Sequence, residues 1–325
     1  MKPLMLTAIV VAAMGTPTRT SELASLSSAT EWINSAPLTE EGLRGKVVLI
    51  QFWTYSCVNW IRTVPYVRAW ARKYRDKGLV VIGVHAPEFE FEKQLGNARW
   101  GAKHFGVDYP VAVDNDFSIW RAFGNQYWPA LYLIDGRGRI RYRHFGEGEY
   151  EEAERTIQKL LAEAGARGVG QSPVSVTPQG VDTAADWDNV KSPETYLGSA
   201  RSENQVSSDS RLRLNGWALG GDWTVERQAA VLNDANGRIR YRFHARDLNL
   251  VMTPGTRAES VRFRVLIDGH APGLAHGVDL DEQGNGVVAE PRMYQLIRQP
   301  GPVADHEFEI QFLDPGVEVF VFTFG

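Results

Sequence analysis

The spacing of apolar residues changes near residue 165, and no other feature of the sequence constrains the fold as strongly. Before this point, apolar runs such as 47–53 and 79–85 alternate with stretches of helical periodicity, a pattern typical of an α/β layer structure. After it, short runs such as 238–243 and 260–267 alternate apolar with polar residues, which predicts antiparallel strands with one solvated face. The sequence therefore predicts an α/β domain followed by an all-β sandwich, with a jelly roll as the favoured arrangement.

Turn residues and the last helical pattern give the expected domain boundaries. A length of 325 residues suits two domains. We expect the α/β domain at 30–164, a linker rich in glycine and proline at 165–190, and the β domain at 191–325. A helix is expected at 150–164, ending at Gly165. Further strands are expected at 109–113, 130–135, 139–145, 211–214, 229–232 and 317–322, and a short helical segment around 117–123.

The composition excludes several classes of function. The 35 Lys and Arg residues nearly balance the 39 Asp and Glu residues, and no basic stripe is present, so we expect no nucleic-acid partner. The chain has a single cysteine, Cys57, which rules out an intrachain disulfide and any multi-cysteine zinc or iron–sulfur site. The seven histidines show no metal-binding spacing, and we expect neither a metal site nor a cofactor.

The N-terminal segment 1–22 has the features of an export signal. Lys2 supplies a positive charge, and residues 4–14 form an apolar run that is shorter than the roughly 20 residues a membrane helix needs. Residues 13–15 have the small-x-small pattern of a cleavage site. We expect an exported protein of the periplasm or cell envelope, with 1–22 as a signal peptide or as the remnant of an upstream membrane region; a wrongly assigned start is the third alternative.

Cys57 lies between a predicted strand and the helix that follows it. Unpaired N–H groups and the positive end of the helix dipole favour a thiolate there, so the position predicts a pKa below the usual value of about 8.5. Cys57 is therefore a candidate nucleophile, and the alternative is a buried, inert thiol. Pro65 falls inside the same helical pattern and should bend the helix.

Two further positions could complete a site around this thiol. Trp128-Pro129 stands directly before a predicted strand and suits a cis peptide bond. Glu88 and Glu90 follow the strand that ends at His85, so a carboxylate could lie near the sulfur. Each of these signals is weak when taken alone.

Six segments together match one known family. They are WTYSCVN (53–59), RTVPYVR (62–68), VIGVHAPEF (81–89), WRAFGNQYWP (120–129), GWALGGDW (216–223) and YRFHARDL (241–248). With these motifs the chain resembles the thioredoxin superfamily, specifically the extracytoplasmic membrane-tethered thiol reductases and the peroxiredoxin-related AhpC/TSA group. It is most similar to the soluble C-terminal part of DipZ-type proteins, in which a thioredoxin-like domain precedes a domain like a carbohydrate-binding module. The resemblance covers essentially everything after residue 30.

The resemblance implies a thiol-disulfide oxidoreductase. Cys57 takes the place of the attacking cysteine, Pro129 that of the cis-proline beside an extended substrate, and Glu88 that of a proton-handling carboxylate. The second cysteine of the family's Cys-x-x-Cys motif is replaced by Trp60, so a dithiol cycle is closed to this chain. Single-thiol chemistry remains, either disulfide exchange or peroxide reduction, completed by an external thiol.

Partners and substrate-binding residues follow from the same resemblance. The expected partners are disulfide-bearing proteins, small thiols or peroxides, with a membrane protein as a candidate thiol donor. Trp53, Trp60 and Trp128 are candidates for substrate binding. The indole of Trp60 has two arrangements open to it: it covers the sulfur, or it packs against Trp53 and Ile61.

The alternative function is a degenerate thioredoxin-like scaffold whose β domain binds a glycan or a protein partner. Aromatic rings could stack on sugars, and acidic side chains could bind hydroxyl groups or Ca²⁺. The competing interpretation places these aromatic residues in the core of the sandwich. The candidates are Trp217, Trp223 and Tyr241 for stacking, and Asp222, Asp279 and Asp281 for polar contacts.

Overall fold

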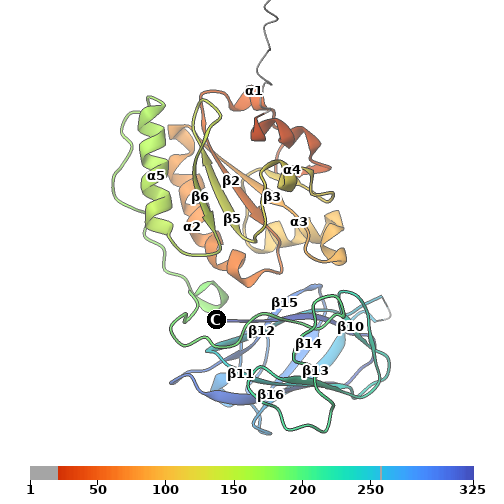
Figure 1. Cartoon of the computed structure of the whole chain (residues 1–325). Coiled ribbons are helices and arrows are strands. Elements are labelled where there is room, and N and C mark those ends of the chain that lie inside the picture. Colours follow the sequence, from red (N-terminus) through yellow and green to blue (C-terminus); the bar gives the residue numbers. More distant parts are fainter. Residues whose placement is uncertain (1–20, 257) are drawn as a thin grey trace, which may run out of the picture.

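The structure, a computed structural model, describes residues 21–256 and 258–325. They form an α/β domain and a β domain that are stacked end to end (Figure 1). The expected export segment lies outside the described residues except for its last two positions. Within the described ranges, no helix combines the length and the apolar composition needed to cross a membrane.

The α/β domain is built on a six-stranded sheet. Its two central strands occur where the apolar runs predict them, and they are parallel to each other. The predicted hairpin also forms, with Ile134 opposite Ile140. In spatial order the strands are β1 (Glu31–Ile33), β4 (Val111–Val113), β3 (Leu79–His85), β2 (Val47–Trp53), β5 (Ala130–Ile134) and β6 (Ile140–Phe145).

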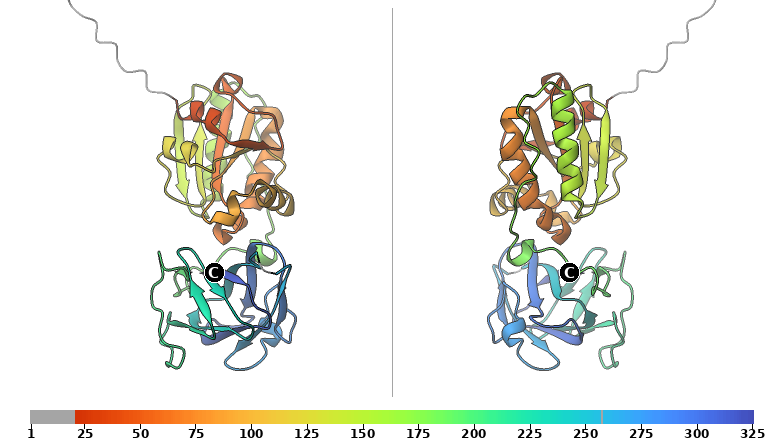
Figure 2. Two further views of the ribbon diagram at one scale, coloured as in Figure 1. Left: turned by 90° about the vertical axis from the view of Figure 1, so that its right-hand side faces the viewer. Right: turned by 90° about the vertical axis from the view of Figure 1, so that its left-hand side faces the viewer.

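Strand β2 is buried on both faces, which explains why all of its residues except Gln51 are apolar. Alternate side chains point to opposite sides of a strand. Val47, Leu49 and Trp53 therefore join the core beneath α2 (Val58–Tyr74) and α5 (Tyr150–Glu163), which lie side by side in Figure 2. Val48 and Phe52 join the core beneath α4 (Ser118–Ala122) and η1 (Glu22–Ser28). The helices are η1 (Glu22–Ser28), α1 (Glu40–Leu43), α2 (Val58–Tyr74), η2 (Arg75–Lys77), η3 (Glu90–Lys93), α3 (Leu95–His104), α4 (Ser118–Ala122) and α5 (Tyr150–Glu163).

The β domain consists of two antiparallel sheets that enclose a second core. The predicted strand at 211–214 is wrong. Only Leu212 is buried there, and the segment runs into a turn at Asn215. One sheet has the order β15 (Arg292–Arg298), β12 (Asp247–Thr253), β17 (Glu318–Phe324), β10 (Ala230–Leu232), β9 (Trp223–Val225), with β7 (Thr195–Tyr196) on β17; the other has β14 (Asn285–Val288), β13 (Val261–Ile267), β16 (Asp305–Phe312), β11 (Arg238–His244), β8 (Trp217–Gly220).

The two domains are joined by a continuous apolar contact. The rings of Phe89 and Phe91 from the α/β domain each lie 4.9 Å from the ring of Phe320 on β17. The segment expected as a linker is also packed, because η4 (Gly180–Asp182) lies against α2 and the backbone N–H of Val174 donates to Glu154. The β domain is therefore docked on the α/β domain.

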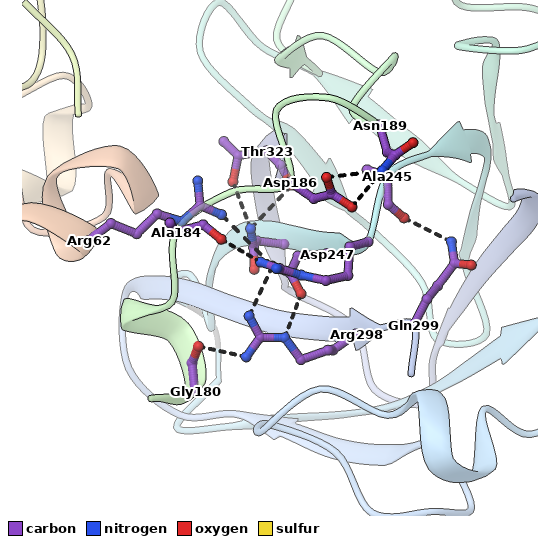
Figure 3. A network of polar contacts seen from close by, with 12 residues as sticks. Arg62, Gly180, Ala184, Asp186, Asn189, Ala245, Asp247, Arg298, Gln299 and Thr323 are labelled. Carbon is purple, nitrogen blue, oxygen red and sulfur yellow. Dashed lines mark hydrogen bonds and ion pairs between the residues drawn. The ribbon is translucent and has the colours of Figure 1, made fainter. Parts of the chain in front are cut away.

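Buried ion pairs reinforce this contact (Figure 3). Arg62 on α2 pairs with Glu147 at 2.9 Å and lies 4.0 Å from Asp247, at the start of β12. The Asp247 carboxylate also pairs with Arg246 at 2.7 Å and with Arg298 at 2.8 Å. The helix that begins after Cys57 is thus connected to the β domain one to two turns from its start.

Candidate functional site

Cys57 is the N-cap of α2, at the end of the turn that follows β2. Its side chain is half-buried, and Sγ lies 3.8 Å from the carbonyl oxygen of Trp128. The peptide bond between Trp128 and Pro129 is cis, as the sequence predicts. The fold therefore places the thiol beside the cis-proline loop, although the two are far apart in the chain.

The prediction of a lowered thiol pKa is wrong. Burial raises the pKa of Cys57 above its ordinary value, and the negative charges of Glu194 and Glu88 raise it further. The backbone N–H groups of Trp60 and Asn59 act in the opposite direction, as expected at a helix N-terminus, but they do not outweigh the burial. The thiol is therefore held mainly protonated at neutral pH in this arrangement of the domains.

Glu88 does lie near the thiol, but the β domain engages its carboxylate. The hydroxyl group of Tyr196 donates to Glu88 at 2.8 Å, and Arg201 pairs with the same oxygen at 2.9 Å. The guanidinium group of Arg201 also stacks over the Tyr196 ring, at 3.5 Å from its centroid. The β domain thus contributes Tyr196, Arg201 and Glu194 to the surroundings of Cys57, and the sequence offers no local signal for any of the three.

Trp53 and Trp60 do not form a substrate-binding surface, so this part of the prediction is wrong. Both side chains are fully buried, and their rings stack at 4.3 Å. The indole N–H of Trp60 donates to Gln51 at 3.4 Å. Of the two arrangements considered for Trp60, the structure has the one packed against Trp53, because both rings belong to the core under α2.

Trp128 is placed differently from the other two tryptophans. It is half-buried, and its indole N–H donates to the carbonyl oxygen of Ala86 at 2.9 Å. Its side chain lines a cleft between the two domains, together with Glu88. Trp128 therefore remains available to a ligand.

Glu92 is a buried acid that the sequence analysis did not identify. Its carboxylate accepts hydrogen bonds from the Ser56 hydroxyl group at 2.6 Å and from the backbone N–H groups of Glu88 and Phe89. Burial raises the pKa of Glu92 from 4.5 to about 7. The only sequence signal is a glutamate three residues after Phe89, the spacing at which an acid caps a helical turn.

Glu92→Gln is expected to remove a pH dependence of stability. The pKa of Glu92 is 4.5 in an ordinary environment and about 7 in the folded protein, so the protonated carboxyl group favours the folded state. This contribution to stability is complete below pH 4.5 and is lost as the pH rises through 7. Glutamine can reproduce the protonated form, with its oxygen facing the two N–H groups and its NH₂ group facing Ser56. As the pH is raised from 4.5 to 8, the free energy of unfolding of the variant, measured with urea, should increase by about 3 kcal/mol relative to that of the wild type.

The matched control is Glu90→Gln, which alters an exposed carboxylate that pairs with Lys93. It should leave the pH profile of the unfolding free energy close to that of the wild type. Parallel profiles for wild type and Glu92→Gln would contradict the assignment of a raised pKa to Glu92.

The residues proposed to bind a glycan are occupied with structural contacts. Trp217 and Tyr241 are fully buried in the sandwich core, as the competing interpretation predicts. Trp223 packs against Phe312. The Asp279 carboxylate pairs with Arg292 at 2.7 Å and accepts the N–H of Gln295. Asp222 and Asp281 bind Asn233 and Asn285, and among residues 21–256 and 258–325 no three metal-ligating side chains converge.

Comparison with known proteins agrees with the fold. The Redoxin family model matches residues 24–161, and the model of the thioredoxin like C-terminal domain matches residues 192–325. Protein DipZ of Mycobacterium tuberculosis is 34% identical over 315 residues, which make up 92% of this chain and 42% of DipZ. The chain therefore spans less than half the length of DipZ.

Two other relatives each match less than half of this chain. A solved thioredoxin-like protein in the oxidized form is 31% identical and covers 45% of this chain and 98% of its own, with a TM-score of 0.41. The thiol-disulfide oxidoreductase YkuV of Bacillus subtilis is 32% identical over 132 residues, 41% of this chain and 88% of YkuV. With its single cysteine beside a cis-proline, and with its matches to the Redoxin model and to YkuV, the chain belongs to the thioredoxin-like redoxin family of thiol-disulfide oxidoreductases.

Proposed function

We propose that the protein carries out thiol-disulfide exchange through Cys57 alone. The observation that supports this most directly is the position of Sγ, half-buried at the start of α2 and 3.8 Å from the carbonyl group that precedes the cis-proline. In this reaction the Cys57 thiolate attacks one sulfur of a disulfide, forms a mixed disulfide and releases the other half as a thiolate. Because the chain has no second cysteine, an external thiol must cleave the mixed disulfide.

Glu88 and Pro129 have supporting roles in this proposal. The carboxylate of Glu88 acts electrostatically on the thiol and is a candidate acceptor for its proton. The backbone around Pro129 would align an extended segment of a disulfide-bearing protein. Relatives named as thiol-disulfide oxidoreductases support disulfides as the substrate class. Peroxide as the oxidant, a membrane protein as the thiol donor and an exported location belong to the same proposal.

The rate at which Cys57 reacts with a disulfide probe is expected to rise steeply with pH. Only the thiolate reacts, and the pKa of Cys57 is raised, so each pH unit between 7 and 9 should increase the rate about tenfold without a plateau. Stopped-flow measurement with 4,4′-dithiodipyridine provides the profile. The Cys57→Ser variant supplies the zero signal.

A plateau below pH 8 would contradict the raised pKa, although it would leave the exchange reaction intact. A thiol that reacts only after the protein is denatured would contradict the proposed function itself. That second result would favour the alternative, in which the α/β domain is a scaffold and the β domain binds a glycan or a protein partner. Pull-down of the full chain on polysaccharides would then be the informative assay.

A further inference from the structure

A cleft of about 360 Å³ lies between the two domains, and Trp128, a neighbour of Cys57, is among its lining residues, although Cys57 itself is not. Glu88 and Trp128 line it from the α/β domain, and Tyr196, Arg201 and Arg227 line it from the β domain. Trp128 is also the residue whose carbonyl oxygen lies 3.8 Å from Sγ of Cys57. A ligand in this cleft would therefore contact a residue that itself contacts the thiol.

The size of the cleft favours a small molecule. Sites for small ligands generally measure about 300–1,000 Å³, and this cleft is near the lower limit. Its β-domain wall is fixed in place, because the side chain of Gln228 accepts a hydrogen bond from the backbone N–H of Glu90 at 3.1 Å. Residue 198 in the same wall must be a glycine, because the backbone of Gln228 and Ala229 occupies the space that a side chain would fill. The cleft is thus a built feature of the docked domains.

The charges that line the cleft favour an anion. Glu88 and Arg201 offset one another as an ion pair at 2.9 Å. The remaining charged residue of the lining is Arg227, which is exposed and makes no side-chain hydrogen bond or ion pair with any residue that the structure describes. Arg227 is therefore the charged residue of the lining that is free to pair with a ligand, while the carboxylate of Glu194 lies outside the lining and accepts a hydrogen bond from Tyr196.

We propose that this cleft binds the low-molecular-weight thiol that cleaves the Cys57 mixed disulfide, and that Arg227 pairs with an anionic group on that thiol. This inference rests on the proposed exchange reaction. The thiolate of the ligand attacks the sulfur of the group bound to Cys57 and forms a new S–S bond with it. The bond to Sγ breaks, and Cys57 leaves as a thiolate that takes up a proton, so one disulfide replaces another without a further oxidant.

The test uses the full chain with Cys57 converted to its methyl disulfide by methyl methanethiosulfonate. Three small thiols then regenerate the free cysteine: 2-mercaptoethanesulfonate, which is anionic, 2-mercaptoethanol, which is neutral, and cysteamine, which is cationic. Intact-mass spectrometry follows the loss of the methylthio group. Each rate is divided by the concentration of the thiolate form of that thiol. It is then divided by the rate at which the same thiol cleaves the methyl disulfide of a short cysteine peptide, which corrects for the intrinsic reactivity of the thiol.

The anionic thiol is expected to react about tenfold faster than the cationic one, a modest effect for charge steering into a cleft. Arg227→Gln should remove this preference and Arg227→Lys should retain most of it. Arg213→Gln, an exposed arginine of the same domain outside the cleft, should leave it unchanged. Equal rates for the three thiols, or a preference that survives Arg227→Gln, would overturn the cleft assignment alone. Failure of the folded chain to accept the methylthio group would overturn the proposed function.

Discussion

Asp247→Ala is expected to lower the free energy of unfolding by about 3 kcal/mol, because it removes a buried carboxylate around which several arginines are arranged. The carboxylate is 1% exposed and pairs with Arg298 and Arg246, and Arg62 lies 4.0 Å away (Figure 3). The expected loss is at the lower end for a broken buried pair. Arg246 and Arg298 keep part of their surface in water, and Arg62 keeps its pair with Glu147.

Urea unfolding of the full chain measures this loss. The comparison variant is Asp108→Ala, which removes an ion pair with Arg72 in which both side chains are about half exposed. Exposed pairs contribute little to stability, so this variant should unfold close to the wild type. If Asp247→Ala were no less stable than Asp108→Ala, the ion pairs around Asp247 would not contribute to the stability of the fold.

The α/β domain could be predicted because its signals are local. The two apolar runs at 47–53 and 79–85 are long enough to identify buried central strands, and they form β2 and β3 with those bounds. Turn residues between 135 and 140 are sufficient to predict the hairpin of β5 and β6. In the β domain the run at 211–214 shows the limit of this approach. An apolar and polar alternation of four residues is too short to require pairing when only one of its side chains is buried.

The chemistry at Cys57 could not be predicted in the same way. The sequence does indicate a helix that begins at this residue, and its N–H groups do favour the thiolate. The sequence gives no indication of Glu194 and Arg201 near the thiol, because the docking of the two domains depends on surfaces that no periodicity describes. The same limit applies to Trp60. Sequence shows that an indole replaces a thiol, and only the packing shows that this indole belongs to the core.

The position of Trp60 decides what restoring a second thiol would do. Its ring stacks on Trp53, meets the Phe105 ring at 5.2 Å and donates to Gln51. Removal of a buried aromatic side chain costs about 3–5 kcal/mol, since it leaves a cavity as well as lost contacts. Trp60→Cys therefore changes two properties at once, the stability of the core and the chemistry of the site.

Trp60→Cys and Trp60→Ala form a matched pair, because both empty the same space and only one adds a sulfur. Both variants should unfold at lower urea concentrations than the wild type, and their free energies of unfolding should be about 3–5 kcal/mol lower. In turnover of a disulfide substrate, Trp60→Cys should exceed both the wild type and Trp60→Ala by more than about a hundredfold, since a well-placed intramolecular group has an effective molarity of roughly 10⁵ M or more. If the two variants had equal turnover when compared at the same fraction of folded protein, residue 60 would no longer face Sγ. The site would then have lost the geometry for disulfide exchange as well as its second cysteine.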